Sequence, residues 1–170
     1  LGPVRHLIAP NSLHHMFLAE WAVAYPEARV HAAPGLSEAT AGTSIHAQLG
    51  DSADPAWAGV LDQVLVRNRI TTEVVFFHAP SSTVVVTDLV QHIPRGWYRG
   101  WRAMIARLDL MTAPEPSVPR KFRLATTDRA AARAAVQRIH GWNAERLVLA
   151  HGPPLNTGGG EALRRAFRWL

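Results

Sequence analysis

Short apolar runs alternate with polar stretches that contain proline and glycine along this chain. Apolar runs of about four to eight residues bounded in this way are typical of buried strands. We therefore expect strands at 4–9, 29–33, 60–66, 73–78, 83–87 and 146–150. The Pro-Ser-Ser sequence at 80–82 predicts a hairpin turn between the fourth and fifth of them.

Helical spacing of apolar residues separates several of these strands. Asn11 is a typical helix N-cap, and the stripe of Leu13, Phe17 and Trp21 behind it predicts a helix over 12–25. Further helices are expected at 97–110, at 129–140 after the N-cap Asp128, and at 161–170. Strands and helices that alternate in this way indicate a layered α/β domain.

The composition fits one folded domain. Of the 170 residues, 48% are hydrophobic and 18% are charged, which favours a globular chain over a disordered one. We therefore predict a single domain over 1–170, with an N-terminal truncation left open because the chain does not begin with Met. No apolar run reaches the ~20 residues needed to span a bilayer, so we expect a cytoplasmic protein without a membrane partner. The absence of cysteine excludes disulfides, thiolate metal sites and cysteine nucleophiles.

The basic residues allow two interpretations. The net charge of +5 can attract phosphates or another anionic partner. The arginines are scattered along the chain, however, which favours an ordinary solvated surface. Arg95, Arg99 and Arg102 lie beside Trp97 and Trp101, a mixture that nucleic-acid-binding proteins use to contact phosphates and bases. Because tryptophan at helical spacing usually packs into a core, we expect both there, and a nucleic-acid partner is the less favoured interpretation.

Three of the predicted strands end in side chains that can carry chemistry. The first leads to His14 and His15, the fifth to Asp88 and the last to His151. In layered α/β folds, ligands bind beyond the carboxyl ends of strands, where loops converge. Imidazole and carboxylate ligands together suit zinc, manganese or iron. The sequence therefore predicts a site for one divalent metal at this edge.

Each of these residues also has a structural interpretation. Adjacent residues on a helix point about 100° apart, so His14 and His15 need not face the same ligand. Asp88 can cap the turn that follows it, and His151 can donate to loop carbonyls. Glu73, at the start of a strand, is expected to be a solvated strand end rather than a ligand. For His6 we expect a packed position in the first strand.

The order of these elements resembles the metallo-β-lactamase-like superfamily. The features that carry the resemblance are the strand followed by His-His, the strand followed by Asp, and the strand followed by Ala-His-Gly-Pro. More narrowly, P-N-S-L-H-H at 10–15 and the F-F-H and V-T-D-L stretches within 76–89 resemble an uncharacterised branch known only as a domain of unknown function. The resemblance covers most of the chain. It implies a layered αββα sandwich whose first strands are missing from this chain.

The resemblance also implies roles for individual residues. His14 and His15 stand where the superfamily's His-x-His-x-Asp-His motif has its final Asp-His pair. Asp88 matches the bridging aspartate that ends a strand, and His151 matches the last histidine ligand.

Two departures from that motif limit the site. Pro10 and Ser12 occupy its first two histidine positions, and no histidine clearly replaces the superfamily's middle one. We therefore expect an incomplete site that holds at most one metal ion. The ligands expected are His15, Asp88 and His151, with His14 as a fourth candidate.

These assignments imply metal-assisted hydrolysis of a small-molecule substrate. A bound cation lowers the pKa of a coordinated water from 15.7 to about 7, and Asp88 or His14 would accept its proton. A helix N-terminus disfavours charged imidazole, which would suit His14 and His15 to metal ligation. The alternative is a non-catalytic domain that keeps the fold and binds a ligand or partner in the same pocket. The sequence does not fix the oligomeric state.

Overall fold

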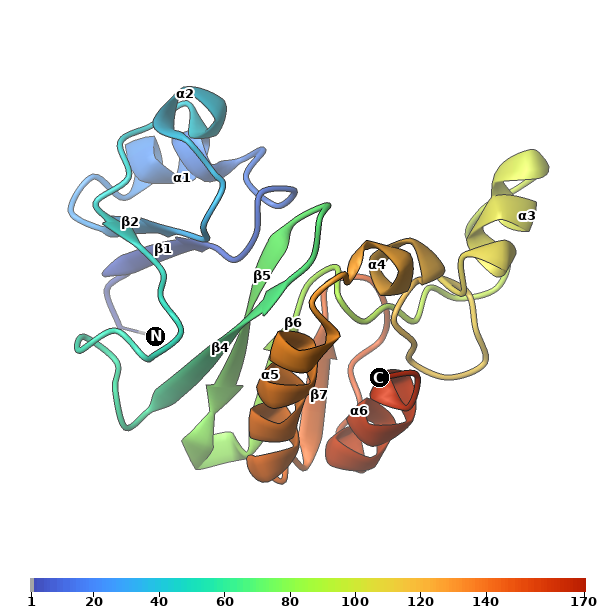
Figure 1. Ribbon diagram of the computed structural model, residues 1–170. Helices are drawn as coiled ribbons and strands as arrows, with labels where there is room; N and C mark the ends of the chain where they lie inside the picture. The colour runs from blue at the N-terminus through green and yellow to red at the C-terminus, as the bar shows by residue number, and fades with distance from the viewer. Residues whose placement is uncertain (1) are drawn as a thin grey trace.

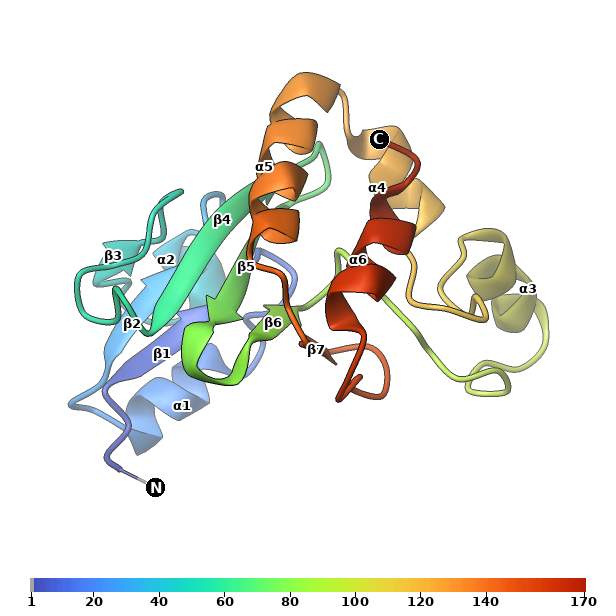
Figure 2. The ribbon, with the colours of Figure 1, turned by 90° about the horizontal axis from the view of Figure 1, so that it is seen from below.

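The computed structural model describes residues 2–170. Two sheets pack face to face between outer helices (Figures 1 and 2). The smaller sheet is parallel, with strands β1 (His6–Ala9), β2 (Arg29–Ala32) and β3 (Ala47–Gln48) in that order. The larger sheet has the order β4 (Leu61–Arg67), β5 (Thr72–His78), β6 (Thr83–Val86) and β7 (Arg146–Leu149). Strand β5 is antiparallel to both β4 and β6, whereas β6 and β7 are parallel.

Helices cover the outer face of each sheet, as Figure 2 shows. Outside the smaller sheet lie α1 (Leu18–Ala24) and α2 (Glu38–Ala41). Outside the larger sheet lie α5 (Arg129–Gly141) and α6 (Gly159–Phe167). The connection between β6 and α5 carries α3 (Trp101–Leu108) and α4 (Arg120–Ala125). This arrangement confirms the predicted αββα layering, and no helix within residues 2–170 is long and apolar enough to cross a membrane.

The larger sheet is buried on both faces. Because successive strand residues point to opposite sides, Val64 and Val66 of β4 pack with the α5 and α6 side chains, whereas Leu65 packs between the sheets. On β5, Val75 joins the helix-facing cluster and Phe76 the inter-sheet cluster. A strand buried on both faces is a continuous apolar run, which is why the sequence predicted these strands well. The hairpin between β5 and β6 is also confirmed, with a 3-10 turn at Ala79–Ser81.

The helix predicted over 12–25 begins only at Leu18, and the residues before it form turns. Asn11 does accept hydrogen bonds, from the backbone amides of Leu13 at 2.9 Å and His14 at 2.8 Å. The prediction that it caps this helix is wrong, because Phe17 is the N-cap of α1. The amide group of the Asn11 side chain is instead engaged with the larger sheet, so the chain turns here before it becomes helical.

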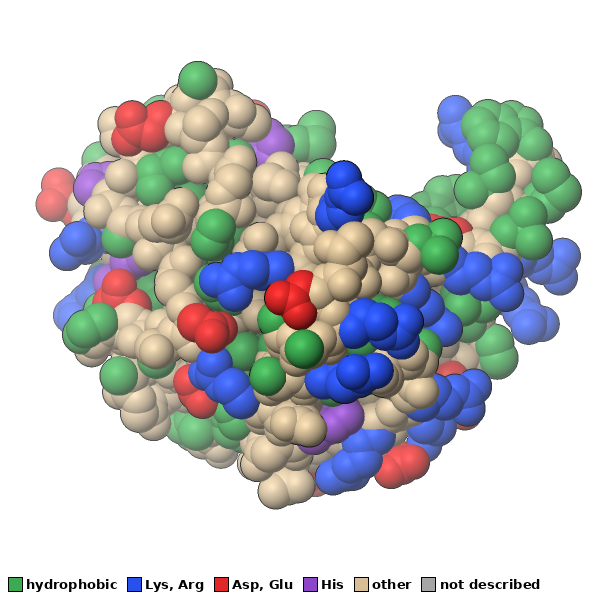
Figure 3. Space-filling view, viewed as in Figure 1, with side chains coloured by type: hydrophobic (Ala, Val, Ile, Leu, Met, Phe, Trp, Pro, Cys, Tyr) green, Lys and Arg blue, Asp and Glu red, His purple; other side chains and the backbone are tan. Residues whose placement is uncertain are grey.

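The helix predicted over 97–110 is shorter and more exposed than expected. Trp97 and Trp101 are 73% and 66% exposed, so the expectation that they pack into a core is wrong. Figures 1 and 3 show why: α3 projects from the body of the molecule, and hydrophobic side chains gather on it. Asp128 caps α5 as predicted, by accepting from the backbone amide of Ala131 at 2.9 Å. The sequence did not predict α4.

Candidate metal centre

The carboxyl ends of β1, β6 and β7 meet at one edge of the sandwich. In the parallel pair β6–β7, Val86 lies opposite Leu149, and Asp88 and His151 each follow two residues later. The end of β1 reaches the same edge because the carbonyl oxygen of Pro10 accepts a hydrogen bond from the backbone amide of Val74 in β5 at 2.8 Å. The strand ends therefore bring together side chains that are far apart in the sequence.

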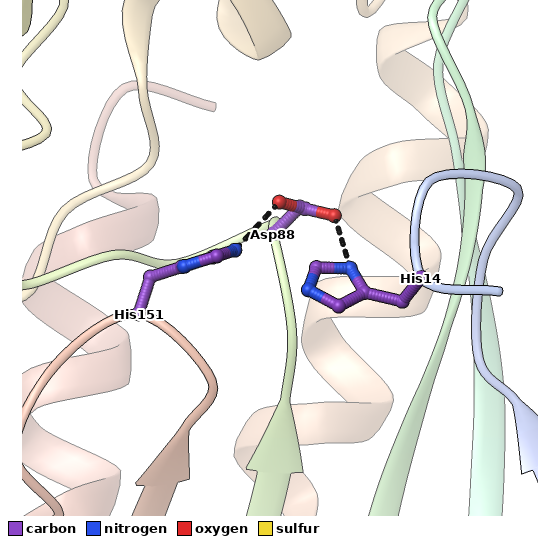
Figure 4. Close-up of side chains that lie close together, drawn as sticks. All are labelled: His14, Asp88 and His151. Atoms are coloured by element: carbon purple, nitrogen blue, oxygen red, sulfur yellow. Dashed lines mark hydrogen bonds and ion pairs between the residues drawn. The ribbon is translucent and has the colours of Figure 1, made fainter. Parts of the chain in front are cut away.

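Three of the predicted site residues lie in contact, and we call His14, Asp88 and His151 the metal triad. His14 Nδ1 lies 2.7 Å from Asp88 Oδ2, and His151 Nε2 lies 3.1 Å from Asp88 Oδ1. Figure 4 shows the carboxylate between the two imidazoles, with one oxygen directed to each. The two ring centroids are 5.1 Å apart. One ligand atom from each residue lies within 4.8 Å of the other two.

His15 lies outside this group. Its Nδ1 atom is 2.9 Å from the carbonyl oxygen of Ser12, so that nitrogen is engaged in the turn before α1. The sequence ranked His15 as a ligand and His14 as the additional candidate, whereas the structure brings His14 to Asp88 and leaves His15 apart. Which of the two binds a metal stays a prediction.

Asn11 connects the Asp88 carboxylate to the turn that carries His14. The residue is fully buried, and its Nδ2 atom lies within hydrogen-bond distance of Glu73 Oε2 (3.1 Å), Thr87 Oγ1 (2.9 Å) and Asp88 Oδ2 (2.9 Å). Its Oδ1 atom accepts from the backbone amide of His14. One side chain thus fixes both the Asp88 carboxylate and the start of the turn that carries His14.

Glu73 is the residue that sequence reasoning placed wrongly. It is 1% exposed rather than solvated, and its carboxylate accepts from the backbone amides of Thr87 (2.8 Å), Asp88 (2.8 Å) and Leu89 (3.0 Å). The predicted hairpin contained the signal for this position. Phe76 pairs with Val85, so the same antiparallel register continued outward sets Glu73 opposite Asp88.

The charges of the site follow from these contacts. Burial alone would raise the pKa of Asp88, but the hydrogen bonds from His14 and His151 outweigh it and hold this pKa well below its usual range. The hydrogen bond to Asp88 raises the pKa of His14, although burial opposes it. The expectation that a helix N-terminus favours neutral His14 is wrong, because α1 begins only at Leu18 and His14 lies in the turns before it. Burial raises the pKa of Glu73, and the Thr87 and Asp88 amides oppose that rise.

The glycine after His151 is required by a close backbone approach. A Cβ atom on Gly152 would lie 2.6 Å from the carbonyl oxygen of His92. In the same place, the backbone amide of His92 donates to the carbonyl oxygen of His151 at 2.8 Å. The loop after β7 is therefore packed directly on the segment after β6, and this contact sets the position of His151.

Comparison with known proteins matches the chain to solved structures alone: no family model and no curated protein sequence matches it. A metallo-β-lactamase from Pontibacter korlensis superposes with a TM-score of 0.57 at 13% identity, covering 98% of this chain and 70% of its own. The metallo-β-lactamase FIM-1 from Pseudomonas aeruginosa, in its mono-zinc form, gives 0.57 at 15% identity, covering 98% and 66%. The flavodiiron core of Flv1 from Synechocystis gives 0.62 at 16% identity, covering 97% and 42%.

The chain has a metallo-β-lactamase-like fold. The resemblance to this superfamily that the sequence indicated is confirmed at the level of the fold, while the narrower branch stays a prediction. Identities of 13% to 16% show the fold and not the reaction. The chain spans less than two thirds of FIM-1 and less than half of the flavodiiron core.

The metal triad fits the metal-binding character of the metallo-β-lactamase-like fold. Two imidazoles and one carboxylate are a donor set that zinc, manganese and iron accept in proteins. The three ligand atoms converge closely enough to hold one ion. Pro10, which stands at one of the superfamily's histidine positions, has no side-chain ligand atom to offer a second ion.

Proposed function

We propose that this chain is a metal-dependent hydrolase that binds a single divalent cation through the metal triad and acts on a small molecule. One observation carries the proposal. The ligand atoms of His14, Asp88 and His151 converge at the strand ends of a metallo-β-lactamase-like fold, above a buried hydrogen-bond network that fixes their positions.

The protein's own residues supply orientation and a proton acceptor. When bound, zinc, manganese or iron acts as a Lewis acid and lowers the pKa of a bound water from 15.7 to about 7. Asp88 and His14 both line the adjoining cavity, so either can orient an attacking water and accept its proton. Asn11 and Glu73 hold the Asp88 side chain and backbone, which keeps the acceptor in a fixed direction.

A one-metal site has a parallel in a protein of this fold. The FIM-1 enzyme is described in a mono-zinc form, so a single ion is compatible with the architecture. This supports an incomplete site that holds one ion.

The ligand set is tested by titrating metal-free protein with zinc and with manganese in a calorimeter. We expect one equivalent to bind, and we expect His14→Ala and His151→Ala each to weaken affinity by at least about 100-fold, or about 2.7 kcal/mol. His15→Ala is the matched control, because it removes the neighbouring imidazole that lies outside the triad.

Three results would contradict the proposal. Absence of metal binding by the wild-type chain, checked by elemental analysis, would remove its basis. An equal loss of affinity in His15→Ala would show that the ligand set is different. Metal binding without turnover of ester, amide or phosphoester substrates would favour the non-catalytic binding domain instead.

A second candidate function is nucleic-acid binding through α3 and the residues before it. Trp97 and Trp101 are largely exposed, and the Arg102 guanidinium lies 5.5 Å from the Trp101 ring centroid. Exposed aromatic rings flanked by arginine suit base stacking and phosphate contacts. Electrophoretic mobility shift with single-stranded and duplex DNA at low salt tests it. Binding that weakens steeply with salt supports this function, and no binding to either form excludes it.

A further inference from the structure

A cavity of about 710 Å³ opens beside the metal triad, and it has the size of a small-molecule site. The triad, His15 and Thr87 form its polar side. Its other side is apolar and comes mainly from the turns after β1 and from α1. The side chains that matter here are Leu13, Met16, Phe17 and Trp21.

These apolar side chains are exposed although they are large. Met16 is 78% exposed, Phe17 62% and Trp21 52%. A contiguous exposed apolar patch on a soluble protein marks a place where a ligand or partner binds. The Trp21 ring is also fixed in orientation, because it stacks on Tyr25 with 5.6 Å between ring centroids and 8° between planes.

The charges around the cavity restrict what it can bind. The chain has 18 lysine and arginine residues, yet within residues 2–170 none of them lines this cavity. Away from the histidines of the site, an anionic group on a substrate would therefore find no lysine or arginine side chain. Burying a charge without a partner is costly, so the part of the substrate that lies along the apolar wall must be uncharged.

We propose that the cavity binds a neutral carboxylic ester or amide with a hydrophobic acyl or aryl group. The hydrophobic group lies against Phe17 and Trp21, and the carbonyl group lies at the metal triad. Water then adds across the acyl bond: the acyl carbon gains hydroxyl, and the leaving oxygen or nitrogen gains hydrogen. This substrate class rests on the proposed hydrolase function and makes it more specific.

Binding is tested without turnover by titrating metal-free protein with N-phenyl-1-naphthylamine, a neutral apolar fluorophore. We expect saturable binding that is weakened about tenfold in Phe17→Ala and in Trp21→Ala, a change of about 1.4 kcal/mol. Trp97→Ala is the matched control, since Trp97 is an exposed tryptophan that does not line the cavity. We expect 1-naphthyl phosphate, which has the same naphthyl ring but is anionic, to compete poorly.

Turnover is tested on the zinc-loaded protein with 4-nitrophenyl butyrate and 4-nitrophenyl phosphate. We expect hydrolysis of the ester alone, with KM raised about tenfold in Trp21→Ala. Because the substituted side chains are exposed, circular dichroism is expected to show folded variants.

Several results overturn this proposal. The first is failure of the wild-type chain to bind the fluorophore. The second is fluorophore affinity in Phe17→Ala and Trp21→Ala that equals the affinity of wild type. The third is displacement of the fluorophore by 1-naphthyl phosphate at concentrations similar to its own. A dimer that dissociates in Phe17→Ala, with no fluorophore binding, assigns the patch to a second copy and also overturns it. Fluorophore binding that depends on Trp21 in a protein that binds no zinc contradicts the hydrolase function while supporting the apolar site.

Discussion

Within residues 2–170, histidine and aspartate side chains form two groups: the metal triad beyond the end of β1, and a second group near the start of β1. In that group, His6 Nδ1 lies 3.0 Å from His31 Nε2, and His31 Nδ1 lies 3.7 Å from Asp54 Oδ2. The Trp57 ring packs against both imidazoles, with centroids 5.1 Å and 4.8 Å away. We call His6, His31 and Asp54 the histidine chain. The two groups contain the same residue types and differ in which residue occupies the centre.

A carboxylate at the centre leaves the imidazoles free to converge, whereas an imidazole at the centre does not. Asp88 faces His14 and His151 with separate oxygens, so the two rings flank one carboxylate and their centroids lie 5.1 Å apart. In the histidine chain, His31 uses its two nitrogens in different directions, and its partners lie at its two ends. The arrangement of lone pairs, rather than the residue types, therefore decides which group is suited to a metal.

The largest expected difference between the two groups concerns stability. Glu73→Ala leaves three buried backbone amides without their acceptor, so we expect the free energy of unfolding to fall by about 3 kcal/mol or more. Asp54→Ala, at the partly exposed end of the histidine chain, is expected to cost about 1 kcal/mol. Urea unfolding monitored by circular dichroism measures both. Equal losses would show that the Glu73 network does not hold the site together.

The second-largest expected effect is the difference in zinc affinity between variants of Asp88 and Asp54. Asp88→Asn removes the central ligand of the metal triad, and we expect it to weaken zinc binding by at least about 100-fold. Asp54→Asn makes the same chemical change in the histidine chain and is expected to leave the affinity unchanged. Isothermal titration calorimetry measures both affinities. Weaker zinc binding in Asp54→Asn would mean that zinc binds at the histidine chain instead of the metal triad.

A smaller effect is expected from the backbone that positions His151. Gly152→Ala forces a Cβ atom against the carbonyl oxygen of His92, so the loop after β7 must shift. We expect about tenfold weaker zinc binding and a loss of about 1–3 kcal/mol in stability, as for other overpacked sites. Gly141→Ala, where a Cβ atom meets nothing within 4 Å, serves as the control. Unchanged zinc affinity in Gly152→Ala would show that this contact does not set His151.

The smallest expected effect is on the pH dependence of unfolding. Burial lowers the pKa of His31 from its ordinary value of 6.5, although Asp54 opposes this. The folded state therefore prefers neutral His31, so its contribution to stability is complete above pH 6.5 and declines as the pH falls below it. We expect wild type to lose more stability than His31→Gln between pH 7 and pH 5 in thermal unfolding. An equal loss of stability in wild type and His31→Gln over this pH range would show that His31 does not cause the effect.

The sequence was sufficient for every strand except the short β3, but not for every side chain at the strand ends. Apolar runs located β4, β5, β6 and β7, and counting past the ends of β6 and β7 located Asp88 and His151. Which of His14 and His15 faces Asp88 depends on the turns that stand where the first part of the helix was predicted. These turns form because the Asn11 side chain makes hydrogen bonds to residues of the larger sheet and the loop after it. Sequence patterns within one segment do not contain such contacts.

The same limit explains the other differences. Glu73 was treated as an isolated strand end, although the hairpin register placed it opposite Asp88. The contact between His6 and His31 requires the parallel pairing of β1 with β2, which no local pattern gives. The apolar stripe of α3 predicted burial, but exposure depends on where the helix lies in the whole fold.

The hydrogen bonds of Asn11 imply an order of events during folding. Its partners Glu73, Thr87 and Asp88 lie 62, 76 and 77 residues further along the chain. Contacts at such sequence separation form late, because long loops must close first. We therefore expect the metal triad to be assembled late in folding, after both sheets have paired. An ion that binds it acts on the native state, so it slows unfolding far more than it speeds folding.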